Sequence, residues 1–259
     1  MKQPRKLELT ALVDFPLVQP GDIVADLILH ALDENRISLE DGDILVLAQK
    51  IISKAEARLV NLNNVHASGQ AEELAAFIEK RPELVELILQ ESNSILRKRP
   101  GTIIVEHKSG FICANAGIDH SNIKGPWGDD KDWVLLLPED SDASAARIRS
   151  YLEKSTGKRL AVLIIDSHGR AWRNGVLGTC IGLSGMPGLV DMRGAEDLNA
   201  YKLRVTTIAA ADELAAAASL LMGQAGEGTP VVHARGFPYA LREGTAAELI
   251  RDKEKDLFR

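Results

Sequence analysis

Four short polar segments carry side chains that could bind a phosphorylated ligand or a divalent cation. One of them follows the apolar stretch Leu160–Ile165 and reads Asp166, Ser167, His168, Gly169, Arg170. A carboxylate and a hydroxyl are oxygen ligands suited to a hard cation, and the guanidinium groups of Arg170 and the nearby Arg173 can bind phosphate or carboxylate oxygens. The alternative is a polar turn in which Asp166 only caps local amides.

A second acidic segment, Asn115–Asn122, contains Asp119 and also follows a run with β-strand character. If the two strands are neighbours in the fold, Asp119 and Asp166 could share one cation. An Asx-rich surface turn would have the same composition. Spacing alone leaves both interpretations open.

Of the other two segments, one is basic and one is glycine-rich. Lys50, Ser53 and Lys54 follow the apolar run Ile44–Ala48, where a lysine could neutralise a phosphate, although solvated lysines at the start of a helix are the commoner outcome. Gly223–Gly228 offers backbone amides that can approach a phosphate closely, or simply connects a helix to a strand. The sequence has neither G-x-x-x-x-G-K-[ST] nor G-x-G-x-x-G after a strand, so a nucleotide site here would be of another type.

Alternating and periodic apolar residues predict the elements that must position these segments. Asp22 and Asp142 are predicted to cap two of the helices, and Gly223 to end another. A break at Arg81–Pro82 separates two helices in the middle of the chain. The predicted strands are Leu7–Val13, Ile44–Ala48, Thr102–Glu106, Phe111–Ala114, Trp133–Leu137, Leu160–Ile165 and Pro230–Ala234, and the predicted helices are Ile23–Leu32, Gln70–Lys80, Glu83–Gln90, Ala143–Lys154 and Val205–Met222.

The order of these elements favours an α+β fold over a doubly wound one. Thr102–Glu106 and Phe111–Ala114 are spaced as a hairpin, and the remaining strands and helices do not follow a regular βαβ succession. Asp119–Asp132 is the longest stretch without periodicity and is interpreted as a functional or flexible loop. We predict a single domain over residues 1–259, within which two subdomains remain an open alternative.

Composition excludes several classes of protein. The chain has 259 residues, 45% of them hydrophobic, which is enough for a large core and argues against disorder. A formal charge of −6 gives no general attraction to nucleic acid. No apolar run is long enough to cross a membrane, so a cytoplasmic protein is expected. The two cysteines, Cys113 and Cys180, lie in apolar segments without metal-site spacing.

Six segments, taken in order along the chain, resemble the coenzyme F420-0:L-glutamate ligase family. Each motif is short and weak alone, but the ordered set, within a match from Phe15 to Gly236, is specific. The segments are Gly42–Glu56, Asn115–Asn122, Leu136–Ala145, Ile165–Gly175, Ala211–Ala215 and Met222–Gly223.

The resemblance implies roles for individual residues. It assigns Asp119 and Asp166 to one metal ion, and Ser167 with Gln224 to a second. Ser167 stands where threonine is common in the family, and Gln224 where an acidic residue can occur, which weakens the second metal site. The chemistry of phosphoryl transfer agrees: metals at Asp119 and Asp166 would bridge phosphate oxygens, and Lys54 with Arg170 or Arg173 would offset the developing charge. Asp119, Asp166 and Lys54 are therefore the expected catalytic residues. The residues that the resemblance assigns to guanine nucleotide binding are Phe15, Pro16, Leu17, Val18, Gln49, Lys50, Lys54, Asn122, Met222, Gly223, Gln224, Ala225, Gly226, Glu227, Gly228 and Thr229.

The resemblance further implies an unusual α+β fold and a stand-alone homodimeric enzyme. That enzyme would use GTP, with Mg²⁺ or Mn²⁺ and often K⁺, to join L-glutamate to coenzyme F420-0 through an acyl phosphate. Two other functions remain open from the sequence: a ligase or kinase that acts on another acid at the same metal site, and a non-catalytic homologue that binds the nucleotide.

Overall fold

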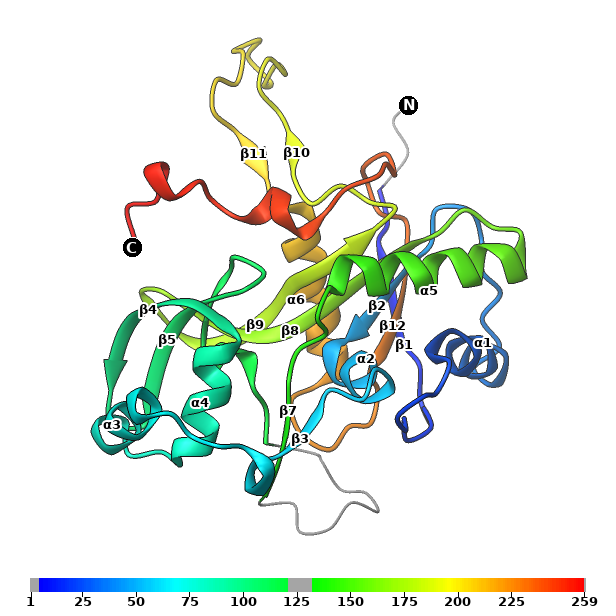
Figure 1. Cartoon of the computed structure of the whole chain (residues 1–259). Coiled ribbons are helices and arrows are strands. Elements are labelled where there is room, and N and C mark those ends of the chain that lie inside the picture. Colours follow the sequence, from blue (N-terminus) through cyan, green and yellow to red (C-terminus); the bar gives the residue numbers. More distant parts are fainter. Residues whose placement is uncertain (1–4, 121–131, 259) are drawn as a thin grey trace.

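The computed structural model describes residues 5–120 and 132–258 of the chain. At its centre is a five-stranded sheet with the order β1–β12–β2–β8–β9 (Figure 1). Strands β2 and β8 run parallel, and the other neighbouring pairs in this sheet are antiparallel. The strands are β1 (Glu8–Ala11), β2 (Ile44–Ala48), β8 (Ala161–Arg170), β9 (Arg173–Ser184) and β12 (Val231–Arg235).

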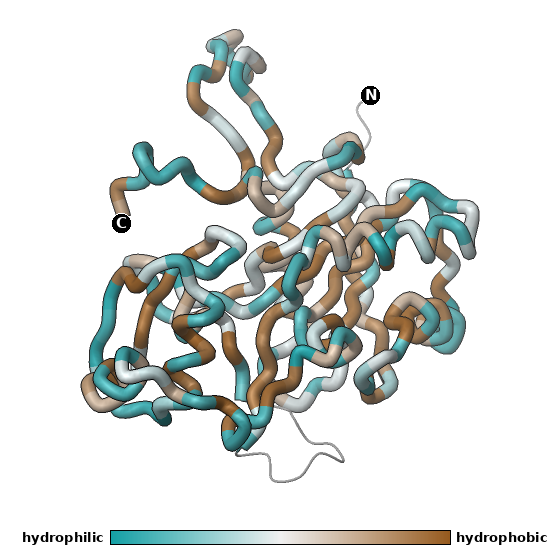
Figure 2. The backbone as a smooth tube through the Cα atoms, in the orientation of Figure 1, coloured by the Kyte–Doolittle hydropathy of each residue, from teal (hydrophilic) through white to brown (hydrophobic). Residues whose placement is uncertain are grey.

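Helices cover both faces of this sheet because side chains alternate between the two faces along each strand. Leu45 and Leu47 of β2 join the core beneath α1 (Val24–Glu34), α2 (Gln49–Ala55) and α5 (Ser141–Thr156). Ile44 and Val46 face the opposite side and pack with α6 (Ala210–Met222). The strands at the centre of the sheet are accordingly hydrophobic along most of their length (Figure 2).

A smaller lobe with its own core lies beside the sheet. It contains α3 (Gly69–Ile78) and α4 (Pro82–Gln90), packed on the antiparallel strands β4 (Ser92–Arg99), β5 (Thr102–His107) and β6 (Ile112–Ala114). Pro82 occupies the first turn of α4, where its missing N–H costs no hydrogen bond, so the predicted break between the two helices is confirmed. With mixed sheets and helices in both parts, the α+β prediction is confirmed as well.

Two short antiparallel pairs complete the fold. β3 (Leu59–Asn61) pairs with β7 (Trp133–Leu135) between the central sheet and the smaller lobe. β10 (Val190–Asp191) and β11 (Thr207–Ile208) form the base of an arm that projects from the molecule, and the C-terminal segment crosses above β9 (Figure 1).

Several predictions of local structure were wrong. The strand that contains Asp166 does not end at Ile165; it continues to Arg170 and turns back as β9, which was not predicted. Strand β4 was also missed, because its residues are charged and mostly exposed. Helix α6 begins at Ala210 rather than Val205, since the preceding residues belong to the arm.

Neither predicted aspartate cap forms. Asp140 caps α5 by accepting from Ala143 N, whereas Asp142 accepts from Leu183 N and Ala246 N. Asp22 accepts from Gln19 N, and α1 has no side-chain cap. Gly223 does follow the last residue of α6, as predicted.

Candidate functional site

A cavity of about 520 Å³, here called the lysine cavity, opens where the parallel strands β2 and β8 end. The carboxyl ends of parallel strands are a frequent place for ligands in sheets of this kind. Three segments far apart in sequence meet there: Phe15–Val18, the start of α2, and the loop after α6. The lining residues are Phe15, Pro16, Leu17, Val18, Ala48, Gln49, Lys50, Ile51, Lys54, Ile165, Asp166, Ser167, Ser219 and 222–230.

The lysine cavity therefore brings together every residue that the sequence assigned to nucleotide binding and that the structure describes. Asn122 lies outside the described residues. Asp119 is not among the lining residues, but its Oδ2 lies 2.7 Å from Lys50 Nζ, so it adjoins the cavity through this ion pair. Ala48, Ile51, Ile165, Ser219 and Pro230 line the cavity without a sequence signal, because apolar and small residues carry no chemical signature.

Lys50 and Lys54 place two ammonium groups on the cavity wall. They are four residues apart on α2 and therefore lie on the same side of the helix. Burial and the neighbouring charge of Lys50 lower the pKa of Lys54, and the carboxylate of Asp119 partly offsets this effect. A phosphorylated ligand would relieve the repulsion between the two ammonium groups, so the pair favours a polyanion.

The carboxylate of Asp166 contacts the ring of His168, a pairing that the sequence did not predict. Residues 166 and 168 lie on the same face of β8, and His168 Nε2 is 3.1 Å from Asp166 Oδ2. The His168 side chain is only 9% exposed, and its ring packs at 5.3 Å from that of Phe111. The alternation of side chains along a strand is the signal that could have found this pair.

Ser167 projects from the other face of β8 and donates a hydrogen bond to Gln224 Oε1 at 2.8 Å. A carboxylate, a hydroxyl and an amide oxygen thus line the same lysine cavity, and these hard donors fit Mg²⁺ or Mn²⁺. Among the described residues, His, Cys, Asp and Glu form no cluster of three or more that could hold a metal. A divalent cation here would complete its shell with phosphate oxygens or water.

Asp119 and Asp166 each have a different polar neighbour, Lys50 and His168 respectively. That the two carboxylates share one cation therefore stays a prediction. The same holds for a second cation at Ser167 and Gln224.

The loop after α6 folds around its own carboxylate. Glu227 Oε2 accepts from Ala225 N at 2.8 Å, and hydrogen bonds from backbone amides of this loop lower the pKa of Glu227. A side chain at position 223 would collide with the Glu227 carboxylate, and Gly223 has a φ of +71°, which favours glycine. Both the lack of space and the backbone conformation therefore require glycine at this position. These amides are arranged to hold an anionic group.

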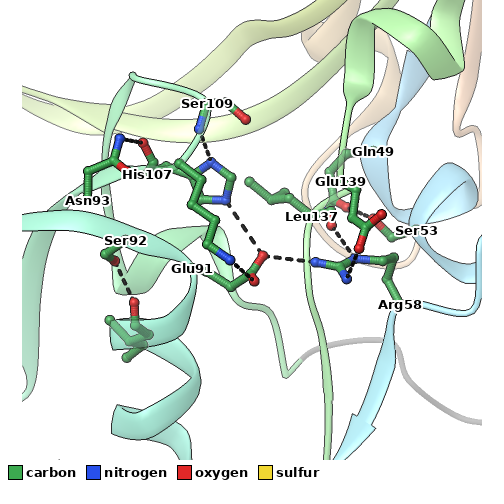
Figure 3. A network of polar contacts seen from close by, with 12 residues as sticks. Gln49, Ser53, Arg58, Glu91, Ser92, Asn93, His107, Ser109, Leu137 and Glu139 are labelled. Carbon is green, nitrogen blue, oxygen red and sulfur yellow. Dashed lines mark hydrogen bonds and ion pairs between the residues drawn. The ribbon is translucent and has the colours of Figure 1, made fainter.

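A polar network joins the helix that carries the lysines to the smaller lobe (Figure 3). Arg58, just after α2, donates to Glu91 at 2.8 Å and to the Leu137 carbonyl. His107 lies next to Glu91, and burial lowers the pKa of His107 to about 4, which keeps it neutral at pH 7. On the cavity side, Gln49 Oε1 accepts from Ser53, which fixes the side chain of Gln49 at the start of α2.

A profile of the family described as F420-0:Gamma-glutamyl ligase matches residues 12–236, which is most of the chain. The chain belongs to the F420-0:gamma-glutamyl ligase family. The resemblance seen in the sequence is thereby confirmed at the level of the family.

Relatives in this family are similar over their full length. The coenzyme F420:L-glutamate ligase of Methanothermobacter thermautotrophicus is 44% identical over 98% of this chain and 99% of its own. The protein of the same name from Methanopyrus kandleri is 44% identical over 93% of both chains, and that of Archaeoglobus fulgidus 41% identical over 98% of this chain and 97% of its own. No helix of the described residues is long and apolar enough to span a membrane.

Proposed function

We propose that this member of the F420-0:gamma-glutamyl ligase family is a GTP-dependent ligase that joins the amine of L-glutamate to a carboxylate of coenzyme F420-0. The family description supplies F420-0, and the names of the relatives supply L-glutamate. The observation that carries the proposal is the lysine cavity, where Lys50, Lys54, Asp166 and Ser167 meet the amide-rich loop 222–229. Two cations and a loop of amides suit a triphosphate.

Amide formation from a carboxylate needs an activated acyl donor. In the proposed reaction, an oxygen of the acceptor carboxylate attacks the γ-phosphorus of GTP, GDP leaves, and an acyl phosphate forms. The amine of L-glutamate then attacks the acyl carbon, loses a proton, and displaces phosphate. No step requires a nucleophile from the protein, so its side chains chiefly bind, orient and neutralise charge.

Each group in the cavity takes one of these tasks. Lys50 and Lys54 neutralise the phosphates, and amides of loop 222–229 other than those that the Glu227 carboxylate occupies hold phosphate oxygens. Asp119, Asp166, Ser167 and Gln224 are the residues that would hold Mg²⁺ or Mn²⁺. When bound there, the metal would offset the charge that develops during phosphoryl transfer. Guanine specificity, an accompanying K⁺ and a homodimer rest on the family resemblance alone.

The test is mass spectrometry of coenzyme F420-0 incubated with the protein, L-glutamate, Mn²⁺ and either GTP or ATP. We expect a product heavier by one or more glutamate residues, formed faster with GTP. Absence of any product with either nucleotide would refute the ligase proposal, whereas equal rates with both would refute only the preference for GTP. Light scattering on the purified protein measures the oligomeric state.

A further inference from the structure

A second cavity of about 470 Å³, here called the edge cavity, runs along β9, the edge strand of the central sheet. Its walls are the β5–β6 loop with Phe111, the first turns of α5 and α6, residues Thr179–Ile181 of β9, and the C-terminal segment. The segment that covers it is the one that crosses above β9 in Figure 1. The edge cavity shares no lining residue with the lysine cavity.

Only one pair of strands separates the two cavities. Thr179 and Cys180 of the edge cavity are the cross-strand partners of Asp166 and Ile165, which line the lysine cavity. Directly opposed residues of antiparallel strands lie about 5 Å apart. Phe111 strengthens this link, since it lines the edge cavity and packs against His168, the neighbour of Asp166.

Charge is distributed unevenly along the edge cavity. Asp212 lies at its inner wall, because Asp212 Oδ1 accepts from the backbone N–H of Cys180 at 2.9 Å. Lys108 and Arg251 belong to the hairpin loop and the C-terminal segment, and their side chains are 57% and 54% exposed, which places them at the outer side. The inner end is therefore negative, and the outer side carries two cations that pair in this structure with Glu91 and Asp256.

The other acidic residues at the edge cavity have partners. Glu139 is 84% exposed, and its Oε1 lies 3.6 Å from Arg58. Asp140 caps α5, and Asp142 accepts from the backbone of Leu183 and Ala246. Asp256 accepts from Phe258 N and lies near Arg251. These bonds offset part of the negative charge that a ligand would otherwise meet.

We propose that the edge cavity binds an α-amino dicarboxylate, with its ammonium group toward Asp212 and its carboxylates toward Lys108 and Arg251. The inference rests on the proposed function, in which L-glutamate is that ligand. A ligase with three substrates needs space beside the nucleotide, and a cavity one strand pair away from Asp166 supplies it. This orientation also directs the amine toward Thr179 and Cys180, whose cross-strand partners Asp166 and Ile165 line the lysine cavity, where the acyl phosphate would form.

The test removes the two outer cations without shortening their side chains much, in the double variant Lys108→Met/Arg251→Met. We expect the KM for L-glutamate to rise at least tenfold, while the KM for GTP stays within twofold. The variant should also discriminate less between L-glutamate and L-glutamine, since one carboxylate loses its partner. Lys158→Met, in the exposed loop after α5, is the matched control and should change neither constant. Thermal melts check the fold, because Lys108 also pairs with Glu91 at 3.3 Å.

A variant at the inner end tests the orientation. Asp212→Asn keeps a carbonyl oxygen for the bond from Cys180 N but loses the charge, so the KM for L-glutamate should rise while that for GTP does not. An unchanged KM for L-glutamate in both variants, or a parallel rise in the KM for GTP, would overturn the inference. If the wild-type protein does not ligate at all, the proposed function fails. Calorimetry with L-glutamate then decides about the edge cavity separately: binding that both variants weaken supports it, and no binding refutes it.

Discussion

Replacing Asp166 by asparagine should separate activity from folding. The Asp166 side chain is 17% exposed, and its partner, His168 Nε2, lies 3.1 Å away. Asparagine has the same shape, and its side-chain oxygen can still accept a hydrogen bond from the His168 ring. Stability should therefore fall by about 1 kcal/mol at most, less than the ~1.5–3 kcal/mol of a complete charge-assisted hydrogen bond.

The effect on ligation should be much larger. A carboxylate contributes a full negative charge to a bound Mg²⁺ or Mn²⁺, which an amide lacks, so metal affinity should decrease steeply. We expect at least a hundredfold slower ligation at saturating GTP, which corresponds to about 2.7 kcal/mol of lost transition-state stabilisation. Ser167→Thr retains the hydroxyl that contacts Gln224 and should be tolerated, whereas Ser167→Ala should lose activity.

Three measurements test this reasoning together. Glutamate incorporation gives the rate, a thermal melt gives the stability, and electron paramagnetic resonance of Mn²⁺ with a non-hydrolysable GTP analogue gives metal binding. Asp33→Asn, on the exposed side of α1, is the matched control and should behave like the wild type in all three. Near-normal ligation and Mn²⁺ binding by a well-folded Asp166→Asn protein would refute the metal assignment.

Three further predictions concern other parts of the molecule. His168→Gln, which can still donate to Asp166, should retain most of the ligation rate that His168→Leu loses; equal rates in the two variants would remove a positioning role for His168. Gly182→Ala should lower the free energy of unfolding by about 2–3 kcal/mol in urea titrations, because the added Cβ would lie 2.6 Å from the Ser141 carbonyl oxygen. The control is Gly169→Ala, whose added Cβ has no atom within 4 Å and which should leave the stability unchanged. Burial alone would raise the pKa of Asp43, but hydrogen bonds from the Arg235 side chain, the Glu40 backbone and the His233 ring lower it below its usual 3.8. The stabilising contribution of ionised Asp43 is therefore present above about pH 4 and is lost as the pH falls through the lower folded-state pKa. Asp43→Asn should lower the free energy of unfolding at pH 7 by about 2–3 kcal/mol. In acid unfolding curves, the difference in stability between this variant and the wild type should become smaller as the pH falls.

Local chemistry made much of the secondary structure predictable. The apolar run Ile44–Ala48 predicted β2 at its observed bounds, and the break at Arg81–Pro82 predicted the start of α4 to within one residue. Elements without such a signal were missed. Strand β9 begins with exposed residues and its buried half is interrupted by Gly178 and Gly182, while β4 is charged and mostly exposed.

The sequence by itself determined the family, the α+β class and the residue types of the candidate site. Ordered motifs carry that information because each depends on neighbouring residues. Only the tertiary structure decided that Phe15–Val18, α2 and the loop after α6 surround one cavity, since strand pairings between distant segments bring them together. It likewise decided that His168 holds Asp166, that Asp142 bonds to β9 rather than capping α5, and that a charged cavity lies one strand pair away. The physical reason is that these contacts depend on the register and packing of segments far apart in the sequence, or on which face of a strand is buried. Neither is a property of a short stretch of sequence.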